Sequence, residues 1–252
     1  MSYKISVIVP ALNEENNINT AIGSIIESFN KIKCSGEIIV VNDGSTDNTK
    51  SVVTTLIDTY PFISLINHDF PKGIGASFWR GVKESHGEYV VLISGDGEND
   101  CYEILRYLPI MDHVDIVIPF WYNTMVRSWR RRYLSKLYKG IINLSFGLLL
   151  NYMNGTVMYR KCVLEGLTLK SNGFFYQTEL LIKAIRKGYL YAEVPCKLKS
   201  RMDGQSKALT INSLLKVMSA YLSTIYFVYA HQKDLEPLKT HSVTASRREE
   251  IL

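Results

Sequence analysis

The stretch VVLISGDGEND, residues 90–100, holds the pattern from which the fold and the chemistry can be worked out. An apolar, β-branched run ends abruptly in Asp96, Glu98 and Asp100, with two glycines among them. Acidic side chains crowded at the end of a buried strand repel one another and resist desolvation, so a positive group should offset them. One interpretation is a solvated turn in which Asp100 caps the helix that follows. The other is a divalent-metal site that holds a phosphorylated ligand.

Similar apolar runs recur along the first half of the chain and alternate with segments of helical periodicity. The predicted strands are residues 5–10, 37–43, 62–67, 89–94 and 114–119, and the predicted helices are residues 15–31, 46–59, 74–86 and 101–111. Continuous apolar strands separated by helices predict an α/β fold with a mostly parallel sheet that is covered on both faces. Ligands of such sheets bind outside the carboxyl ends of the strands. The polar clusters PALNEE (10–15), NDGSTDNT (42–49) and SGDGEND (94–100) should therefore converge on one crevice.

Length and composition limit the class of protein. A chain of 252 residues that is 46% hydrophobic can bury one large core. Its net charge of +5 is modest, and we expect no nucleic-acid partner. Four widely spaced cysteines and the lack of a signal-peptide pattern predict a cytoplasmic location. No window offers the roughly 20 apolar residues of a membrane span.

The pattern changes after residue 120. Residues 127–150 combine basic and aromatic side chains and then become almost wholly apolar, which is typical of a segment that lies on an anionic membrane surface. A further helix is predicted over residues 175–188, and the last amphipathic helix covers about 209–230. That last helix carries an apolar stripe of Ile211, Leu214, Leu215, Met218, Leu222 and Ile225. The stripe predicts core packing or an oligomer contact, with membrane contact as the alternative. Residues 231–252 have the composition of a solvated tail.

Four motifs, taken in order, resemble the family 2 glycosyltransferases of GT-A fold. They are IVPALNEE (8–15), NDGSTDNT (42–49), SGDGE (94–98) and EVPCKLKSRMDGQSK (193–207), and the resemblance covers about residues 4–207. Within that family the chain is most similar to the polyprenyl-phosphate sugar synthases, such as dolichyl-phosphate mannose synthase.

The resemblance implies a division of the chain. A catalytic domain would span residues 1–208, with a nucleotide-binding half at about 1–119 and an acceptor half at about 120–208. The amphipathic helix 209–230 and the polar tail 231–252 would follow it.

The resemblance also implies a binding site for a GDP- or UDP-linked sugar. The residues that it places on the nucleotide are Pro10, Asn13, Glu14, Asp43, Gly44, Lys72, Gly73, Ser94 and Gly95. Asp43 would accept hydrogen bonds from the base. The segment KGIGAS (72–77) is a weak dinucleotide fingerprint, because it lacks the third glycine, and is better interpreted as a basic loop near phosphates or as a helix start.

A metal, Mg²⁺ or Mn²⁺, would complete the acids of the opening stretch. Ser94 replaces the first Asp of the family's DxD motif, so ligation would fall on Asp96 together with Glu98. Arg201 and Lys207 would close over the diphosphate and act in catalysis with Asp96. A solvated basic loop is the alternative interpretation of Arg201 and Lys207.

The acceptor side is implied by weaker matches. Arg131, Ser135, Asn154 and Gly155 stand at the family's acceptor positions. Trp121 stands where the most similar relatives carry an arginine, and Asn151 and Asn154 replace an Asp and a Ser. Glu179 would be the catalytic base if the acceptor were a hydroxyl group. Its alternative role is an ion pair with Lys183, four residues further along the helix.

The expected function is inverting, metal-dependent transfer of a sugar to a polyprenyl phosphate, by a peripheral protein on the cytosolic membrane face. Transfer to a sugar hydroxyl in surface-polysaccharide or glycolipid assembly is the first alternative, with a glycan as acceptor. A sugar-nucleotide-binding protein without catalysis is the second, motivated by Ser94, Trp121 and Asn154. A nucleotidyltransferase would share the metal chemistry but does not explain the last motif. A homo-oligomer or a membrane partner protein is compatible with each.

Overall fold

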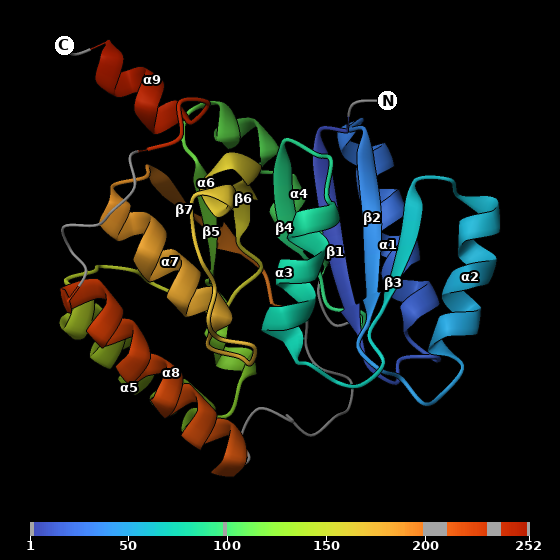
Figure 1. Cartoon of the computed structure of the whole chain (residues 1–252), viewed down its shortest axis with the longest axis horizontal. Coiled ribbons are helices and arrows are strands. Elements are labelled where there is room, and N and C mark those ends of the chain that lie inside the picture. Colours follow the sequence, from blue (N-terminus) through green and yellow to red (C-terminus); the bar gives the residue numbers. More distant parts are fainter. Residues whose placement is uncertain (1–2, 98–99, 199–210, 231–237, 251–252) are drawn as a thin grey trace.

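The computed structural model of the chain describes residues 3–97, 100–198, 211–230 and 238–250. A seven-stranded sheet has the order β3-β2-β1-β4-β6-β5-β7, with helices on both faces (Figure 1). The strands are β1 (Ile5–Ala11), β2 (Gly36–Asn42), β3 (Ile63–Asn67), β4 (Tyr89–Leu92), β5 (Ile116–Trp121), β6 (Met158–Arg160) and β7 (Tyr191–Cys196). The α-helices are α1 (Ile18–Ile32), α2 (Thr49–Thr59), α3 (Ile74–Glu84), α4 (Cys101–Leu105), α5 (Trp129–Phe146), α6 (Lys161–Glu165), α7 (Tyr176–Lys187), α8 (Ile211–Ala230) and α9 (Val243–Glu249), with 3-10 turns at Leu108–Asp112 and Thr124–Val126.

The sheet separates two apolar core layers. Successive residues of a strand point to opposite faces, so Ile8 packs in one layer while Val7 and Val9 pack in the other. The first layer lies beneath α3, α5, α6, α7 and α8, and the second beneath α1, α2 and α4. Burial on both faces explains why these strands read as continuous apolar runs, and the predicted α/β class is confirmed.

Strand order places the carboxyl ends of β1, β2 and β4 next to one another. β1 pairs in parallel with β2 through Ile5↔Gly36 and with β4 through Ile8↔Leu92. The three polar clusters that follow these strands therefore start at the same edge of the sheet.

Two strands were not predicted, and one predicted helix is shorter. β6 has only three residues and runs antiparallel to β4 and β5, so it offers no periodicity to recognise. β7 lies at the edge, beside β5, and contains Pro195, which is tolerated at an edge strand. The helix predicted over 101–111 ends at Leu105, and Pro109 then lies in a 3-10 turn.

The expectation of a solvated C-terminal tail is wrong for residues 242–244, whereas residues 246–250 are exposed. The first turn of helix α9 docks beside the amino ends of β5 and β7, and Ser242 and Thr244 are buried. The buried carboxylate of Asp115 accepts hydrogen bonds from Val243 N at 2.8 Å, from Thr244 N at 2.9 Å and from the Thr244 hydroxyl. Arg160 Nε donates to the same carboxylate at 3.1 Å. A largely polar segment is thus held mainly by hydrogen bonds, together with the apolar contact of Leu238 with the core.

Of the stripe predicted on the last helix, Ile225 packs against the core, but four other members do not. Leu214, Leu215, Met218 and Leu222 are exposed, and α8 contacts the core through other residues, among them the buried Val228. Helix α8 lies beside α5 (Figure 1), and the Tyr221 hydroxyl is 2.7 Å from Ser145 Oγ of α5. The large apolar side chains that these two helices expose define what we term the α5–α8 surface: Trp129, Tyr133, Leu134, Leu137, Ile141, Leu144, Leu214, Leu215, Met218, Leu222, Tyr226 and Tyr229.

No helix within the described ranges combines the length and the apolar character that crossing a bilayer requires. The predicted boundary at residue 208 falls in the segment 199–210, outside the described residues.

Candidate functional site

The site is built at the carboxyl end of the parallel strands, where three loops interlock. Asn13 N donates to Ser45 Oγ at 3.0 Å, and Thr46 N donates to Asn13 Oδ1 at 2.8 Å. Asn13 takes a positive φ of 57°, a conformation that asparagine tolerates better than most residues. Gly95 N donates to Pro10 O at 3.1 Å and joins the third loop to the first. The predicted convergence of the three clusters is confirmed.

Asp43 follows β2 and is only 5% exposed. Its carboxylate accepts hydrogen bonds from Lys72 N at 2.9 Å and from Gly73 N at 2.8 Å, and His68 Nδ1 lies 2.7 Å away. Burial alone would raise the pKa of Asp43, but the hydrogen bonds from His68, Lys72 and Gly73 outweigh it and hold the pKa below its ordinary value. The carboxylate therefore fixes the loop of residues 68–73 as well as standing at the predicted base position.

His68 is a residue of this site that the sequence analysis did not single out. Its side chain is 6% exposed and pairs with Asp43. The signal lay in its place directly after β3, because β3 neighbours β2 and the two strand ends must meet.

Gly44 and Gly73 allow two backbone conformations that this site requires. Gly44 has a φ of +75°, and a Cβ there would approach the Phe70 carbonyl carbon to 2.7 Å. Gly73 has a φ of +101° and would meet Asn172 O at 2.5 Å. Both positions combine a left-handed conformation with close backbone contact, so they require glycine. KGIGAS is thus a helix start, with α3 beginning at Ile74.

The opening stretch contains the helix cap that the sequence suggested. Asp100 is the N-cap of α4 and accepts from Tyr102 N at 3.1 Å. Ser94 and Asp96 follow β4 and are partly exposed at the same edge as Asp43. Glu98 lies outside the described residues, as do Arg201 and Lys207.

A divalent metal fits the donor chemistry of this edge. Mg²⁺ in nucleotide sites is commonly held by one or two carboxylates plus phosphate oxygens, and the Asp96 carboxylate would be one such ligand. Within the described ranges no group of three or more His, Cys, Asp or Glu side chains is arranged to hold a metal. The further oxygen ligands that the metal needs would thus come from Glu98 and from the diphosphate of a bound nucleotide.

The predicted acceptor residues lie on α5 and in the loop that follows it. Arg131 is exposed and Ser135 partly buried on α5. Asn154 Oδ1 accepts from Thr178 Oγ1 at 3.0 Å, which itself lies 2.7 Å from the Tyr138 hydroxyl. That network ties α5 and α7 to the loop after α5.

The EVP motif anchors the start of this same loop after α5. Asn151 N and Nδ2 donate to the two oxygens of Glu193 at 2.7 and 3.0 Å. Gly155 packs close to Pro119, whose Cγ would lie 3.0 Å from an added Cβ. Trp121 lies edge-on to the Tyr152 ring, with ring centroids 6.2 Å apart.

Glu179 adopts the structural alternative. It is 1% exposed and pairs with Lys183 Nζ at 2.5 Å. Its two oxygens also accept from Lys170 N at 3.0 Å and Ser171 N at 2.9 Å. Burial would raise the pKa of Glu179, but the hydrogen bonds from Lys183 and Ser171 outweigh it and lower the pKa. A carboxylate with this many partners and no exposure does not fit the role of base for an acceptor hydroxyl.

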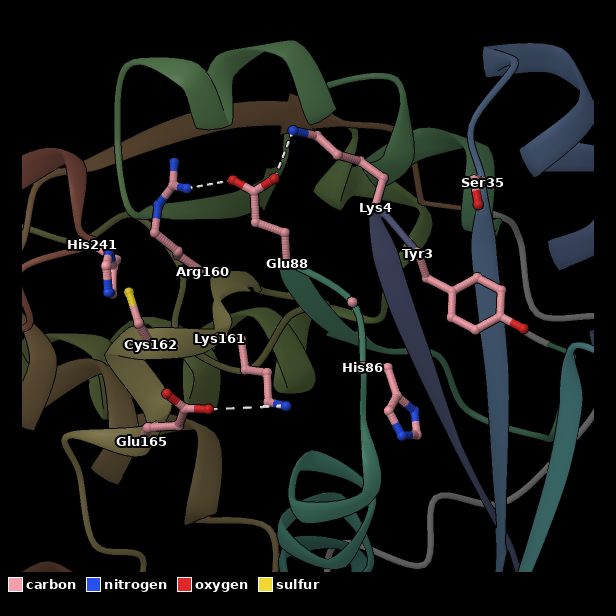
Figure 2. A pocket seen from close by; sticks show the side chains of 11 residues that line it. Tyr3, Lys4, Ser35, His86, Glu88, Arg160, Lys161, Cys162, Glu165 and His241 are labelled. Atoms are coloured by element: carbon pink, nitrogen blue, oxygen red, sulfur yellow. Dashed lines mark hydrogen bonds and ion pairs between the residues drawn. The ribbon is translucent and has the colours of Figure 1, made fainter. Parts of the chain in front are cut away.

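A cavity of about 540 Å³ lies at the amino ends of β1 and β4, opposite the candidate site. Figure 2 shows that Lys4 and Arg160 both point toward Glu88, and Lys161 toward Glu165. Its cations are therefore already paired with acids, and the cavity is separate from the candidate site.

Known proteins resemble this chain in sequence. The family model for glycosyl transferase family 2 matches residues 6–168. A dolichol-phosphate mannosyltransferase of Pyrococcus furiosus is 29% identical over 248 residues, which cover 95% of this chain and 68% of that protein. A dolichyl-phosphate beta-glucosyltransferase of Trichomonas vaginalis is 35% identical over 115 residues, which cover 42% of this chain and 35% of that relative.

The fold also matches a solved structure. Glucosyl-3-phosphoglycerate synthase from Mycobacterium tuberculosis, in complex with Mn²⁺ and UDP-glucose, superposes with a TM-score of 0.66 and 22% identity, covering 88% of this chain and 79% of that one. The match to the family model spans more than half of the sequence and includes the three loops at the sheet edge. The chain therefore belongs to glycosyl transferase family 2 and is a glycosyltransferase of GT-A fold.

Proposed function

We propose that this glycosyltransferase moves a sugar from a nucleotide sugar to a polyprenyl phosphate at a membrane surface. The observation that carries the proposal is that Asp43, Ser94 and Asp96 follow β2 and β4, the two strands that flank β1, at the carboxyl end of the parallel strands. Two relatives named for transfer to dolichol or dolichyl phosphate support the acceptor class.

The residues of the chain would divide the work. The loops around Asn13 and Asp43 would bind the nucleotide, and Asp96 would hold Mg²⁺ or Mn²⁺ together with Glu98. When bound, the metal would stabilise the negative charge that develops on the leaving diphosphate. Arg201 and Lys207 would add positive charge on the same group. The polyprenyl phosphate would attack the anomeric carbon with its own anionic oxygen, so no base is required.

The buried state of Glu179 favours a phosphate acceptor over a hydroxyl acceptor. A hydroxyl would need a base within hydrogen-bond reach. Glu179, the residue proposed for that role, is instead paired with Lys183 inside the protein.

Thermal unfolding tests the donor site. We expect UDP or GDP, at about 100 times its dissociation constant and with Mn²⁺, to add about 2.7 kcal/mol of stability, or roughly 5–10 °C in Tm. Omission of Mn²⁺ should remove most of the shift. If no nucleotide shifts the Tm of a cooperative transition, a nucleotide-sugar donor is excluded. That result would contradict both the enzyme and the non-catalytic nucleotide-binding protein.

The α5–α8 surface supports the membrane part of the proposal. Leu144 is 88% exposed, and patches of large apolar side chains of this kind mark interaction surfaces. Exposed cations, among them Arg130, Lys136 and Lys216, lie on the same two helices and suit an anionic lipid surface.

Vesicle binding tests this part. The double variant Leu144→Glu with Met218→Glu should lower the fraction bound to vesicles of anionic phospholipid at least tenfold, because each change removes apolar contact and adds repulsion. The matched control, Ser51→Glu with Thr54→Glu, adds the same charge on the exposed face of α2. Equal binding by all three proteins would show that the α5–α8 surface does not contact lipid.

A further inference from the structure

The loop that carries Lys72 and Gly73 is held from two sides. On one side Asp43 accepts from both of its backbone amides, at 2.9 and 2.8 Å. On the other side Gly75 N donates to Asn172 O at 2.8 Å. An added Cβ on Gly75 would lie 2.3 Å from Ser171 O, so the two backbones are in direct contact. The position of this loop is therefore set as much by residues 170–172 as by Asp43.

The segment 168–172 has no regular structure of its own, and the buried Glu179–Lys183 pair satisfies its backbone. The Glu179 carboxylate accepts from the amides of Lys170 and Ser171. Lys183 Nζ donates to Thr168 O at 2.7 Å and to Glu179 Oε1 at 2.5 Å. One ion pair thus fixes three backbone groups of the segment that supports the loop.

The pair is sealed from solvent. The side chains of Glu179 and Lys183 are 2% and 4% exposed, and Lys183 Nζ lies 4.5 Å from the centre of the Phe227 ring of α8. Removing one partner would leave an uncompensated buried charge or an amide N–H without an acceptor, so the segment could not keep its position.

We infer that Glu179 and Lys183 are positioning residues of the nucleotide site: they hold residues 170–172, which in turn hold the loop of Lys72 and Gly73 against Asp43. The inference rests on the proposed nucleotide site. It assigns to Glu179 an effect on donor binding, whereas a catalytic base would affect turnover alone.

Glu179→Gln separates these roles. Its side chain has nearly the same shape, but it loses the charge that Lys183 needs and turns a donor toward the segment's amides. We expect Kd for the nucleotide that stabilises the wild type, UDP or GDP with Mn²⁺, to rise at least tenfold. The kcat at saturating donor should stay within about threefold, with an unchanged pH profile. Lys183→Met should raise Kd in the same way. The control Glu84→Gln removes a carboxylate from an exposed i,i+4 pair, in which Arg80 lies 3.1 Å away, and should change neither constant.

Hydrogen exchange on the wild type tests the inference without any substitution. Because coupling between sites is reciprocal, nucleotide binding should slow exchange at the Lys170 and Ser171 amides at least tenfold. The same experiment covers the case in which Glu179→Gln does not fold.

These outcomes test the proposed function and the role of Glu179 separately. A wild type that binds no nucleotide would overturn the proposed function. A wild type that binds, beside a Glu179→Gln protein with unchanged Kd, would overturn the inference alone. Unchanged Kd with a kcat at least 100-fold lower would identify a base instead.

Discussion

Asp96→Asn is expected to lower the rate of sugar transfer at least about 100-fold. Asp96 is the described carboxylate at the carboxyl end of β4, and an amide is a much weaker ligand for Mg²⁺ or Mn²⁺ than a carboxylate. Loss of one electrostatic contact to a developing charge commonly costs about 100-fold to 1,000-fold in turnover. The measurement is transfer from the nucleotide sugar that stabilises the wild type, together with the Mn²⁺-dependent shift in Tm, which should be largely lost.

The same stretch of sequence supplies a matched control. Asp100→Asn makes the same chemical change four residues later, where the side chain caps α4 through Tyr102 N. Asparagine caps helices about as well as aspartate, so activity and the Mn²⁺ shift should remain near the wild-type values. If Asp96→Asn also retains activity within about threefold, the metal is held elsewhere or is not needed.

Asp115→Asn is expected to reduce the free energy of unfolding by about 3–5 kcal/mol, the usual consequence of breaking a buried, hydrogen-bonded ion pair. Asp115 is fully buried, and its carboxylate joins Arg160 to the first turn of α9. The NH₂ group of asparagine is a donor and would face the donors that the Asp115 carboxylate now accepts from. The Arg160 charge would also be less compensated.

The stability of the Asp115→Asn variant and the attachment of its α9 segment can be measured separately. Chemical unfolding gives the loss of stability, and limited proteolysis should show earlier cleavage within residues 238–250. Asp112→Asn, an exposed site three residues earlier, should change the free energy of unfolding by no more than about 0.5 kcal/mol. A loss below about 1 kcal/mol in the Asp115 variant would mean that α9 contributes little to the fold.

Much of the sheet was predictable because burial on both faces leaves a direct trace in the sequence. β1, β2 and β4 each contain a run of consecutive apolar residues, and the polar clusters at their ends indicated the site. β6 and β7 left no such trace, since one is three residues long and the other is a half-buried edge strand.

Other features depend on partners that periodicity does not specify. The apolar residues of α8 lie on more than one face, so the pattern did not show that Val228 would be buried and Leu222 exposed. Helix α9 is held by hydrogen bonds to Asp115, which hydropathy cannot register. For Glu179 the sequence left two roles open, and the choice required the position of the 170–172 backbone.

The order of the strands also bears on how the chain folds during synthesis. β3, β2, β1 and β4 are contiguous in the sheet and are complete by Leu92, so this half can pair while the ribosome is still adding residues. Asp115, in contrast, meets Val243 and Thr244 across 128 and 129 positions of sequence. Until those residues leave the exit tunnel, the nascent domain holds a carboxylate without two of its backbone donors. The final step of folding therefore waits for the segment that carries α9.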